Sequence, residues 1–379
     1  MAIIYFDAPF FNLSSATIIN RNLASWLISL GHDVRITPGK GNSAPILHGE
    51  DEPLKSIICR IEAVAHPEIT IRNSWPPDMT PPPSGRLVLI QPWEFGSMPE
   101  SWVDPFSKDV DEVWVPSGYV RDVYLAGGVP SNRVQIVPNG FDPEIFRPDA
   151  TPLGLKTTKG FRFLFVVGAI HRKGIDFLLN AYSTIFTATD DVCLVIKDFG
   201  ADSFYRKMTL RSQIVEFMSQ PGVPEIEYRD ADLSESDLAG LYCTCDTLVL
   251  PYRAEGFGMP VLEAMACATP PIVTDAGPSL DFCTDFNSIR IRASKRVLGE
   301  KQVFGLKTVE YPSLFRVDLD DLRMKMKWAK ENKKELKKLG LAGAAYAREN
   351  WTWDTAAGIA DERIRKLLAK PEVNSCLEA

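Results

Sequence analysis

The chain starts the same folding pattern twice, and this repetition limits the architectures open to it. A short apolar run at residues 3–6 is followed by a helical stretch at 16–30 and a second strand-like run at 32–36. After a polar stretch, the apolar run 161–168 again precedes a helical segment, 175–185. Strands that alternate with helices are typical of parallel sheets. We therefore expect an α/β protein with two Rossmann-like units.

Composition agrees with a globular chain of this size. The residues are 45% hydrophobic and 24% charged, and a length of 379 residues is enough to build two domains. A net charge of −7 argues against a general nucleic-acid binder, because phosphate contacts need a basic surface. We see no long apolar run and no signal-peptide pattern, so we expect a cytoplasmic protein.

The polar residues do not indicate a metal site or a redox cofactor. The seven cysteines are scattered, and Cys243 and Cys245 lack zinc spacing, so free thiols are expected. The loop 7–15 contains no G-x-G-x-x-G motif, which argues against a nicotinamide or flavin. Asp-x-Asp triplets, which can hold Mn or Mg, occur three times, and in an acidic chain we interpret this repetition as chance. They lie at Asp109/Asp111, Asp230/Asp232 and Asp318/Asp320.

The stretch from residue 255 to residue 266 has the features of a ligand-binding helix start. Pro260 suits the first helical position, and Gly256 and Gly258 allow a ligand to approach the backbone. The helix N-terminus then offers N–H groups to an anion. Glu255 and Glu263 can face the same molecule, so it should also carry hydroxyls, as a nucleotide-sugar does. The alternative is that two glutamates flank an ordinary helix cap.

The full string Glu255-Gly-Phe-Gly-Met-Pro-Val-Leu-Glu263-Ala-Met-Ala resembles the E-x7-E signature of retaining GT-B glycosyltransferases, especially family GT4. The resemblance implies two Rossmann-like domains that face each other across a cleft, with a C-terminal helix that crosses back to the first. We place the acceptor-side domain at residues 1–155 plus 355–379 and the donor-binding domain at 156–354.

The family also implies an activity. It predicts a hexosyltransferase that moves a hexose from GDP-mannose or a UDP-hexose to a hydroxyl acceptor, with retention and without a metal. The nucleotide-sugar is a substrate, so no cofactor is expected. The acceptor could be a glycan, a lipid-linked sugar, a protein or a small molecule. The alternatives are a non-catalytic GT-B subunit that binds a glycan or a partner, a sugar-nucleotide epimerase and a phosphorylase.

Several donor-side residues follow from the same resemblance. Lys173 and Arg172 match the cations that grip the donor diphosphate, whose charge grows as the glycosidic bond breaks. His171 competes with Arg172 for the second role. Glu255 would accept hydrogen bonds from the transferred sugar, and Glu263 from the ribose. The remaining predicted donor-binding residues are Gly168, Lys197, Arg229, Phe257, Gly258 and Met259.

The acceptor is expected on the first-domain side. The strand-like run 86–91 leads into Pro-Trp-Glu-Phe-Gly, where Glu94 could orient or deprotonate an acceptor hydroxyl. The alternative for Glu94 is a structural carboxylate paired with an arginine or the backbone. Phe10, Phe11 and Trp93 are candidates to contact the acceptor, although any phenylalanine could instead pack into the core.

The lysine-rich stretch 323–338 has charges interleaved with apolar residues at helical spacing. A solvated helix face is the default interpretation, and the alternative is a patch that binds an anionic partner or makes a weak peripheral membrane contact.

Overall fold

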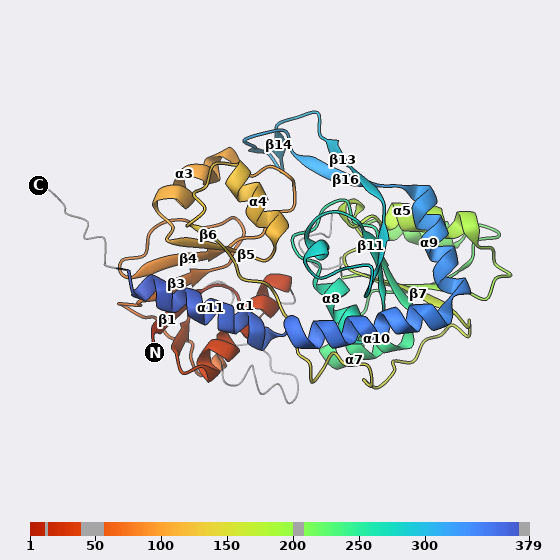
Figure 1. Ribbon diagram of the computed structural model, residues 1–379, viewed down its shortest axis with the longest axis horizontal. Coiled ribbons are helices and arrows are strands. Elements are labelled where there is room, and N and C mark those ends of the chain that lie inside the picture. The colour runs from red at the N-terminus through yellow and green to blue at the C-terminus, as the bar shows by residue number, and fades with distance from the viewer. Residues whose placement is uncertain (12–13, 39–56, 200–207, 371–379) are drawn as a thin grey trace, which may run out of the picture.

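The computed structural model describes residues 1–11, 14–38, 57–199 and 208–370. Over these residues it contains two six-stranded parallel sheets, each with its own helices (Figure 1). The strand order is β2-β1-β3-β4-β5-β6 in the first sheet and β12-β11-β10-β7-β8-β9 in the second. The expected α/β class with two Rossmann-like units is confirmed.

The first sheet is built from short apolar strands with helices between them. Ser14 and Ser117 cap two of these helices: their hydroxyls accept from the amides of Thr17 and Val120, each at 3.3 Å. The strands are β1 Ile3–Asp7, β2 Asp33–Ile36, β3 Ile69–Arg72, β4 Arg86–Ile90, β5 Glu112–Val115 and β6 Val134–Ile136. The helices are α1 Ser15–Ser29, α3 Glu100–Lys108 and α4 Gly118–Ala126.

The second sheet has three fully buried strands, β8 (Cys193–Lys197), β10 (Thr247–Leu250) and β11 (Pro271–Thr274), which is typical of a parallel sheet covered on both faces. The other strands are β7 Arg162–Val166, β9 Glu225–Arg229 and β12 Ile289–Ile291. The helices are η1 His171–Lys173, α5 Ile175–Ile185, α6 Arg211–Met218, α7 Glu235–Thr244, α8 Met259–Ala266, η2 Pro278–Asp281, α9 Leu319–Glu331 and α10 Lys333–Asn350.

Helix α11 (Trp353–Leu368) returns to the first domain, as the GT-B resemblance predicts. Figure 1 shows it beside α1, and its apolar face lies in the same core cluster as β1 and α1. Two polar contacts also hold it: His32 Nε2 lies 2.9 Å from Asp361, and Arg363 pairs with the buried Glu112. The fully buried side chains of this helix are Ala357, Ala360, Ile364 and Leu367.

Residues 293–317 form an arm that was not expected from the sequence. Strand β13 (Ala293–Val297) pairs with β16 (Ser313–Val317), and β14 (Gln302–Val303) pairs with β15 (Leu306–Lys307), both antiparallel. In Figure 1 the arm runs from the second domain toward α3 and α4 of the first. The amide of Val309 donates to the carbonyl of Met98 at 3.0 Å, so the arm is hydrogen-bonded to the first domain.

In the described part of the chain, no helix is both long enough and apolar enough to cross a bilayer. The six cysteines that the structure describes are free thiols, and Cys376 lies outside the described residues.

We predict that Ile364→Ala lowers the free energy of unfolding by about 2–5 kcal/mol, because it leaves a cavity between α11 and α1. Urea unfolding followed by circular dichroism would measure this change. Leu368→Ala is the matched control, since Leu368 is 37% exposed on the same helix, and it should cost no more than about 0.5 kcal/mol. Equal losses in the two variants would contradict the packing of α11 described above.

Candidate functional site

The loops that follow β4, β7 and β10 meet at the carboxyl ends of the two sheets. Glu94 follows β4, Arg172 and Lys173 follow β7, and Glu255 follows β10. The two ion pairs described below join them. Loops in this position form the ligand sites of open α/β sheets.

Lys173 and Glu255 form an ion pair whose side chains are only 12% and 11% exposed. Burial and the neighbouring Arg172 lower the pKa of Lys173, and they outweigh the opposite effect of Glu255. Burial alone raises the pKa of Glu255, but the charges of Lys173 and Arg172 hold that pKa below its ordinary value. The site therefore presents a desolvated cation beside an ionised carboxylate.

Arg172 connects the two domains. Its Nη1 lies 3.1 Å from Oε1 of Glu94 and donates to the carbonyl of Ala254 at 3.0 Å. Both charged side chains are mostly buried, at 11% and 24% exposed. The contact agrees with the alternative for Glu94, a carboxylate paired with an arginine, and it also places Glu94 beside the predicted diphosphate cations.

Glycine conformations fix the two loops of the second domain. Gly174 has φ +78°, and a Cβ there would lie 2.0 Å from the carbonyl oxygen of Pro251. Gly258 has φ +100° and precedes α8, which begins at Met259, one residue before the predicted start at Pro260. Only glycine adopts these conformations freely, so both turns depend on it.

The loop before α8 also contacts the first domain. Ser117 Oγ donates to the carbonyl of Gly256 at 2.8 Å, and the amide of Gly118 donates to Asp281 at 2.8 Å. The start of α4 therefore lies against the loops that follow β10 and β11.

Glu263 lies one turn into α8 and accepts a hydrogen bond from the hydroxyl of Tyr242 at 2.9 Å. Burial raises its pKa to about 7, against a smaller opposite effect of that hydrogen bond. Near neutral pH this carboxyl is divided between its charged and neutral forms, so it can accept a hydrogen bond and, in part of the population, donate one.

The other predicted donor-binding side chains have partners of their own. Lys197 is fully buried, lies 3.8 Å from the ring centre of Phe199 and donates to the carbonyl of Asp198 at 3.0 Å. Arg229 is bound by Glu227 at 2.7 Å and by the carbonyl of Gly154 at 2.7 Å. The donor-binding roles of Lys197 and Arg229 remain predictions.

His171, Phe257 and Gly168 are the other residues predicted to bind the donor. His171 is exposed and lies 4.0 Å from Asp176, and burial together with Arg253 lowers its pKa. The ring of Phe257 is buried against Phe282, so any contact of this residue with a ligand would come from its backbone. Gly168 accepts from the amide of Ile170 at 2.8 Å, within the turn that leads to His171.

Two of the three predicted acceptor-side rings are buried: Phe10 follows the core alternative given for the phenylalanines, and Trp93 is buried as well. Phe10 is fully buried and packs edge-on against Phe6 at 5.7 Å between ring centres. Trp93 is 1% exposed, and its indole N–H donates to the carbonyl of Ser97 at 2.7 Å. Burying such large rings is more favourable than exposing them to solvent. Phe11 is half-buried beside Phe10.

One aspartate of each triplet is engaged elsewhere. Asp111 pairs with Arg86, Asp230 pairs with Arg211, and Asp318 caps α9. Among the residues the structure describes, no group of three or more His, Cys, Asp or Glu is arranged to hold a metal ion.

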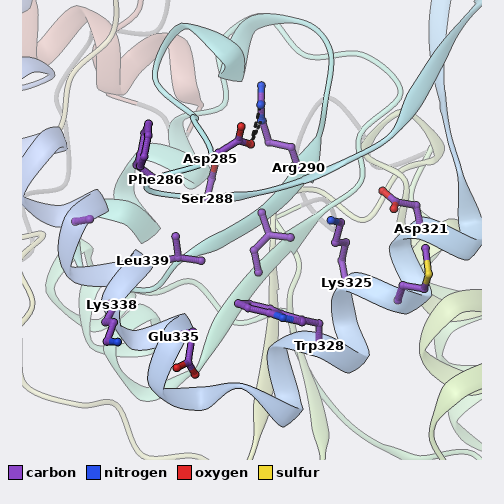
Figure 2. Close-up of a pocket in the computed structure, with 13 residues that line it drawn as sticks. Asp285, Phe286, Ser288, Arg290, Asp321, Lys325, Trp328, Glu335, Lys338 and Leu339 are labelled. Carbon is purple, nitrogen blue, oxygen red and sulfur yellow. Dashed lines mark hydrogen bonds and ion pairs between the residues drawn. The ribbon is translucent and has the colours of Figure 1, made fainter.

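A groove of about 760 Å³ lies between β12, α9 and α10, and Glu94, Arg172, Lys173 and Glu255 are not among the residues that line it. Figure 2 shows Trp328 of α9 and Leu339 of α10 pointing into it. Its charged lining residues are three acids and three bases, so its charge does not select an anionic partner or a membrane. These residues are Asp285, Asp321, Glu335, Arg290, Lys325 and Lys338.

We predict that Glu263 makes stability fall as pH rises through neutrality. Its folded-state pKa of about 7 exceeds the ordinary value of 4.5, so the folded state favours the neutral carboxyl. This stabilisation is full below about pH 4.5 and is lost as pH rises through about 7. The Tm of wild type relative to Glu263→Gln should therefore drop between pH 5 and 8.

The exposed Glu349→Gln on α10 is the control for this series, and its Tm should follow wild type at every pH. A constant difference in Tm between wild type and Glu263→Gln would contradict the raised pKa.

Part of the chain is similar in sequence to known proteins. A family described as glycosyl transferases group 1 matches residues 161–286. The D-inositol 3-phosphate glycosyltransferase of Arthrobacter sp. (strain FB24) is 31% identical over 152 residues, 38% of this chain and 35% of that protein. The mannosylfructose-phosphate synthase of Agrobacterium fabrum is 28% identical over 155 residues, 40% of this chain and 34% of that protein. The chain thus spans about a third of the length of these two curated relatives.

Solved structures match over nearly the whole chain. The sucrose-phosphate synthase of Thermosynechococcus elongatus has a TM-score of 0.67 at 15% identity and covers 97% of this chain and 99% of its own. HepE of Anabaena, in complex with UDP-glucose, has a TM-score of 0.66 at 13% identity and covers 96% and 99%. At this identity the likeness shows the fold. The chain therefore has the GT-B fold and carries, over residues 161–286, the sequence pattern of the glycosyl transferases group 1 family.

Proposed function

We propose that the protein is a retaining glycosyltransferase that moves a hexose from a nucleoside-diphosphate sugar to a hydroxyl acceptor. The observation that carries this proposal is the group formed by Arg172, Lys173, Glu255 and Glu94 at the carboxyl ends of both sheets. The glycosyltransferase names of the matching relatives and the UDP-glucose in the Anabaena structure support the same chemistry.

The cations would stabilise the leaving group. As the bond between the sugar C1 and the phosphate oxygen breaks, negative charge develops on the diphosphate. Arg172 and Lys173 are held close together and desolvated, so their interaction with that charge is stronger than in water. The amides from Phe257 to Met259, at the start of α8, would add hydrogen bonds to the same group. In this proposal the two side chains supply the positive charge that a metal supplies in other enzymes.

Glu255 would act on the transferred sugar. Its pKa is held low, so it is ionised at neutral pH and can accept hydrogen bonds from sugar hydroxyls. Its negative charge would also stabilise positive charge that develops at C1. The acceptor oxygen would attack C1 from the face that the phosphate leaves, and the proton of the acceptor hydroxyl would pass to the departing phosphate oxygen. This same-face exchange retains the configuration.

Glu263 and Glu94 would orient the remaining hydroxyls. Glu263 would bind the ribose, and its pKa of about 7 allows it to accept or donate there. Glu94 would face the acceptor from the first domain. A GDP-mannose or UDP-hexose donor, and a cytoplasmic location, remain predictions of the sequence.

A thermal-shift panel with UDP, GDP, ADP and CMP and their sugars, with and without Mg, tests donor binding. One nucleoside diphosphate should raise the Tm, because a ligand present at 100 times its Kd stabilises the folded state by about 2.7 kcal/mol. We predict that Lys173→Met abolishes this shift, since it removes one of the two diphosphate cations.

Lys173→Met also leaves Glu255 without its ion-pair partner, so its baseline Tm should fall. For that reason the measured quantity is the ligand-induced shift and not the Tm itself. The exposed Lys334→Met on α10 is the control and should keep the full shift. A full shift in Lys173→Met would overturn the assignment of Lys173, and no shift with any nucleotide in wild type would favour a non-catalytic subunit.

We predict that Glu255→Gln lowers kcat by at least about 100-fold, because the amide cannot stabilise positive charge at C1. Nucleotide affinity should stay within about threefold of wild type, since the bound diphosphate would replace Glu255 as the negative partner of Lys173. Release of free nucleotide from the donor in the presence of acceptor measures kcat, and isothermal titration measures affinity. A wild-type rate in Glu255→Gln would exclude the proposed role of this carboxylate.

A further inference from the structure

The arm, residues 293–317, is anchored in the second domain beside residues 171–174, which contain Arg172 and Lys173 and are called the cationic turn below. Strand β16 pairs with β13, and the amide of Phe315 in β16 donates to the carbonyl of Arg253 at 2.7 Å. Arg253 comes two residues before Glu255 and is 8% exposed. The sequence offers one local signal for Arg253, its place two residues before the start of the E-G-F-G string.

Arg253 holds the turn from which Arg172 and Lys173 project. Its guanidinium donates to both carboxylate oxygens of Asp176 at 2.6 Å and to the carbonyl of His171 at 2.6 Å. Its backbone amide donates to the carbonyl of Arg172 at 2.8 Å. A bidentate arginine pair fixes orientation more closely than a single charge contact does. Arg253 therefore determines where the backbone of the turn lies.

The other end of the arm contacts the first-domain segment 92–98, which contains Glu94. The amide of Glu310 donates to Ser97 Oγ at 2.8 Å. Ser313 packs against Gly96 so closely that a Cβ on Gly96 would lie 2.0 Å from the serine oxygen. The ring of Phe304 meets the ring of Phe95 edge-on at 5.4 Å between centres.

Phe304 occupies a backbone position that does not favour it. Phe304 and Gly305 form the two-residue turn between β14 and β15, with φ angles of +52° and +79°. Turns with two positive φ angles favour Asn-Gly, because a bulky side chain is strained there. A phenylalanine in this turn indicates that its contact with Phe95 matters more than the local backbone preference.

We propose that the arm is a latch that positions the Glu94 segment against the cationic turn, with Phe304 and Arg253 as positioning residues at its two ends. The ion pair between Glu94 and Arg172 lies between these two ends. The kinetic consequences rest on the proposed function. Loosening the tip at Phe304 should displace Glu94 and leave the donor cations in place, whereas loosening the base at Arg253 should displace the donor cations.

Hydrogen exchange followed by mass spectrometry on the full chain tests the latch without any substrate. In Phe304→Asn, amides of segment 92–98 should exchange about tenfold faster, while those of 171–176 keep the wild-type rate. The Tm should not fall by more than a few degrees, because asparagine suits this turn better than phenylalanine does. Phe286→Asn is the matched control: Phe286 is 83% exposed and lies away from both segments, so neither rate should change. Wild-type exchange at 92–98 in Phe304→Asn would overturn the latch.

Measurements of kcat and of the nucleotide Kd then distinguish the roles of the two ends of the arm. Phe304→Asn should lower kcat about tenfold with an unchanged Kd for the nucleotide, because a small misplacement of a positioned group is enough to slow transfer. Arg253→Lys should raise the nucleotide Kd about tenfold and speed exchange at 171–174, since lysine cannot make the bidentate contact. Arg290→Lys, which changes a surface arginine that contacts Asp285, is its control. If Arg253→Lys is poorly folded, Asp176→Asn removes the same contact from the partner side.

The outcomes of the two experiments are distinguishable. Equal effects of Phe304→Asn and Arg253→Lys on both kcat and Kd would contradict the assignment of separate ends. A wild-type protein that transfers no sugar would overturn the proposed function, whereas the exchange rates at 92–98 would still decide whether the arm positions that segment.

Discussion

The buried ion pair of Lys173 and Glu255 is the interaction on which the rest of the site depends. Its members are 82 residues apart in sequence and come from loops that follow neighbouring strands, β7 and β10. Neither charge would be stable alone at this depth, because desolvation of an unpaired charge is costly. Each loop is therefore held in place by the charge that the other provides. Gly174 and Gly258 shape the backbone so that the two side chains can meet.

The local signals of the second domain were read correctly from the sequence. Helix α5 spans residues 175–185 as predicted, because Gly174 precedes a run of strong helical periodicity. Ser234 accepts from the amide of Asp237 at the start of α7, in a Ser-x-x-Asp pattern that is typical of a helix start. Glycine, proline and capping residues act over three or four positions, so their effect does not depend on the rest of the fold. The residues of the site itself came from the family resemblance.

Contacts between distant segments could not be read in the same way. Trp93 and Phe10 lie in loops where an aromatic ring can point to solvent or to the core, and only the surrounding packing decides. Strand β13 is largely exposed, so it lacks the apolar pattern that marks a strand. The turn at Phe304 carries no residue of the usual turn type at its first position. Arg253 could contact many acids, and its choice of Asp176 follows from the path of α5.

The position of α11 has a consequence for how the chain is made. The first domain is discontinuous: its sheet is complete by β6, but part of its core is supplied by Ile364 and Leu367, beyond the whole second domain. During translation the second domain can bury its own core before α11 leaves the ribosome, whereas the first domain waits with an apolar face of α1 uncovered. Domains generally fold as units as they emerge. Here the order of completion is reversed, and the first domain to be synthesised is the last to close.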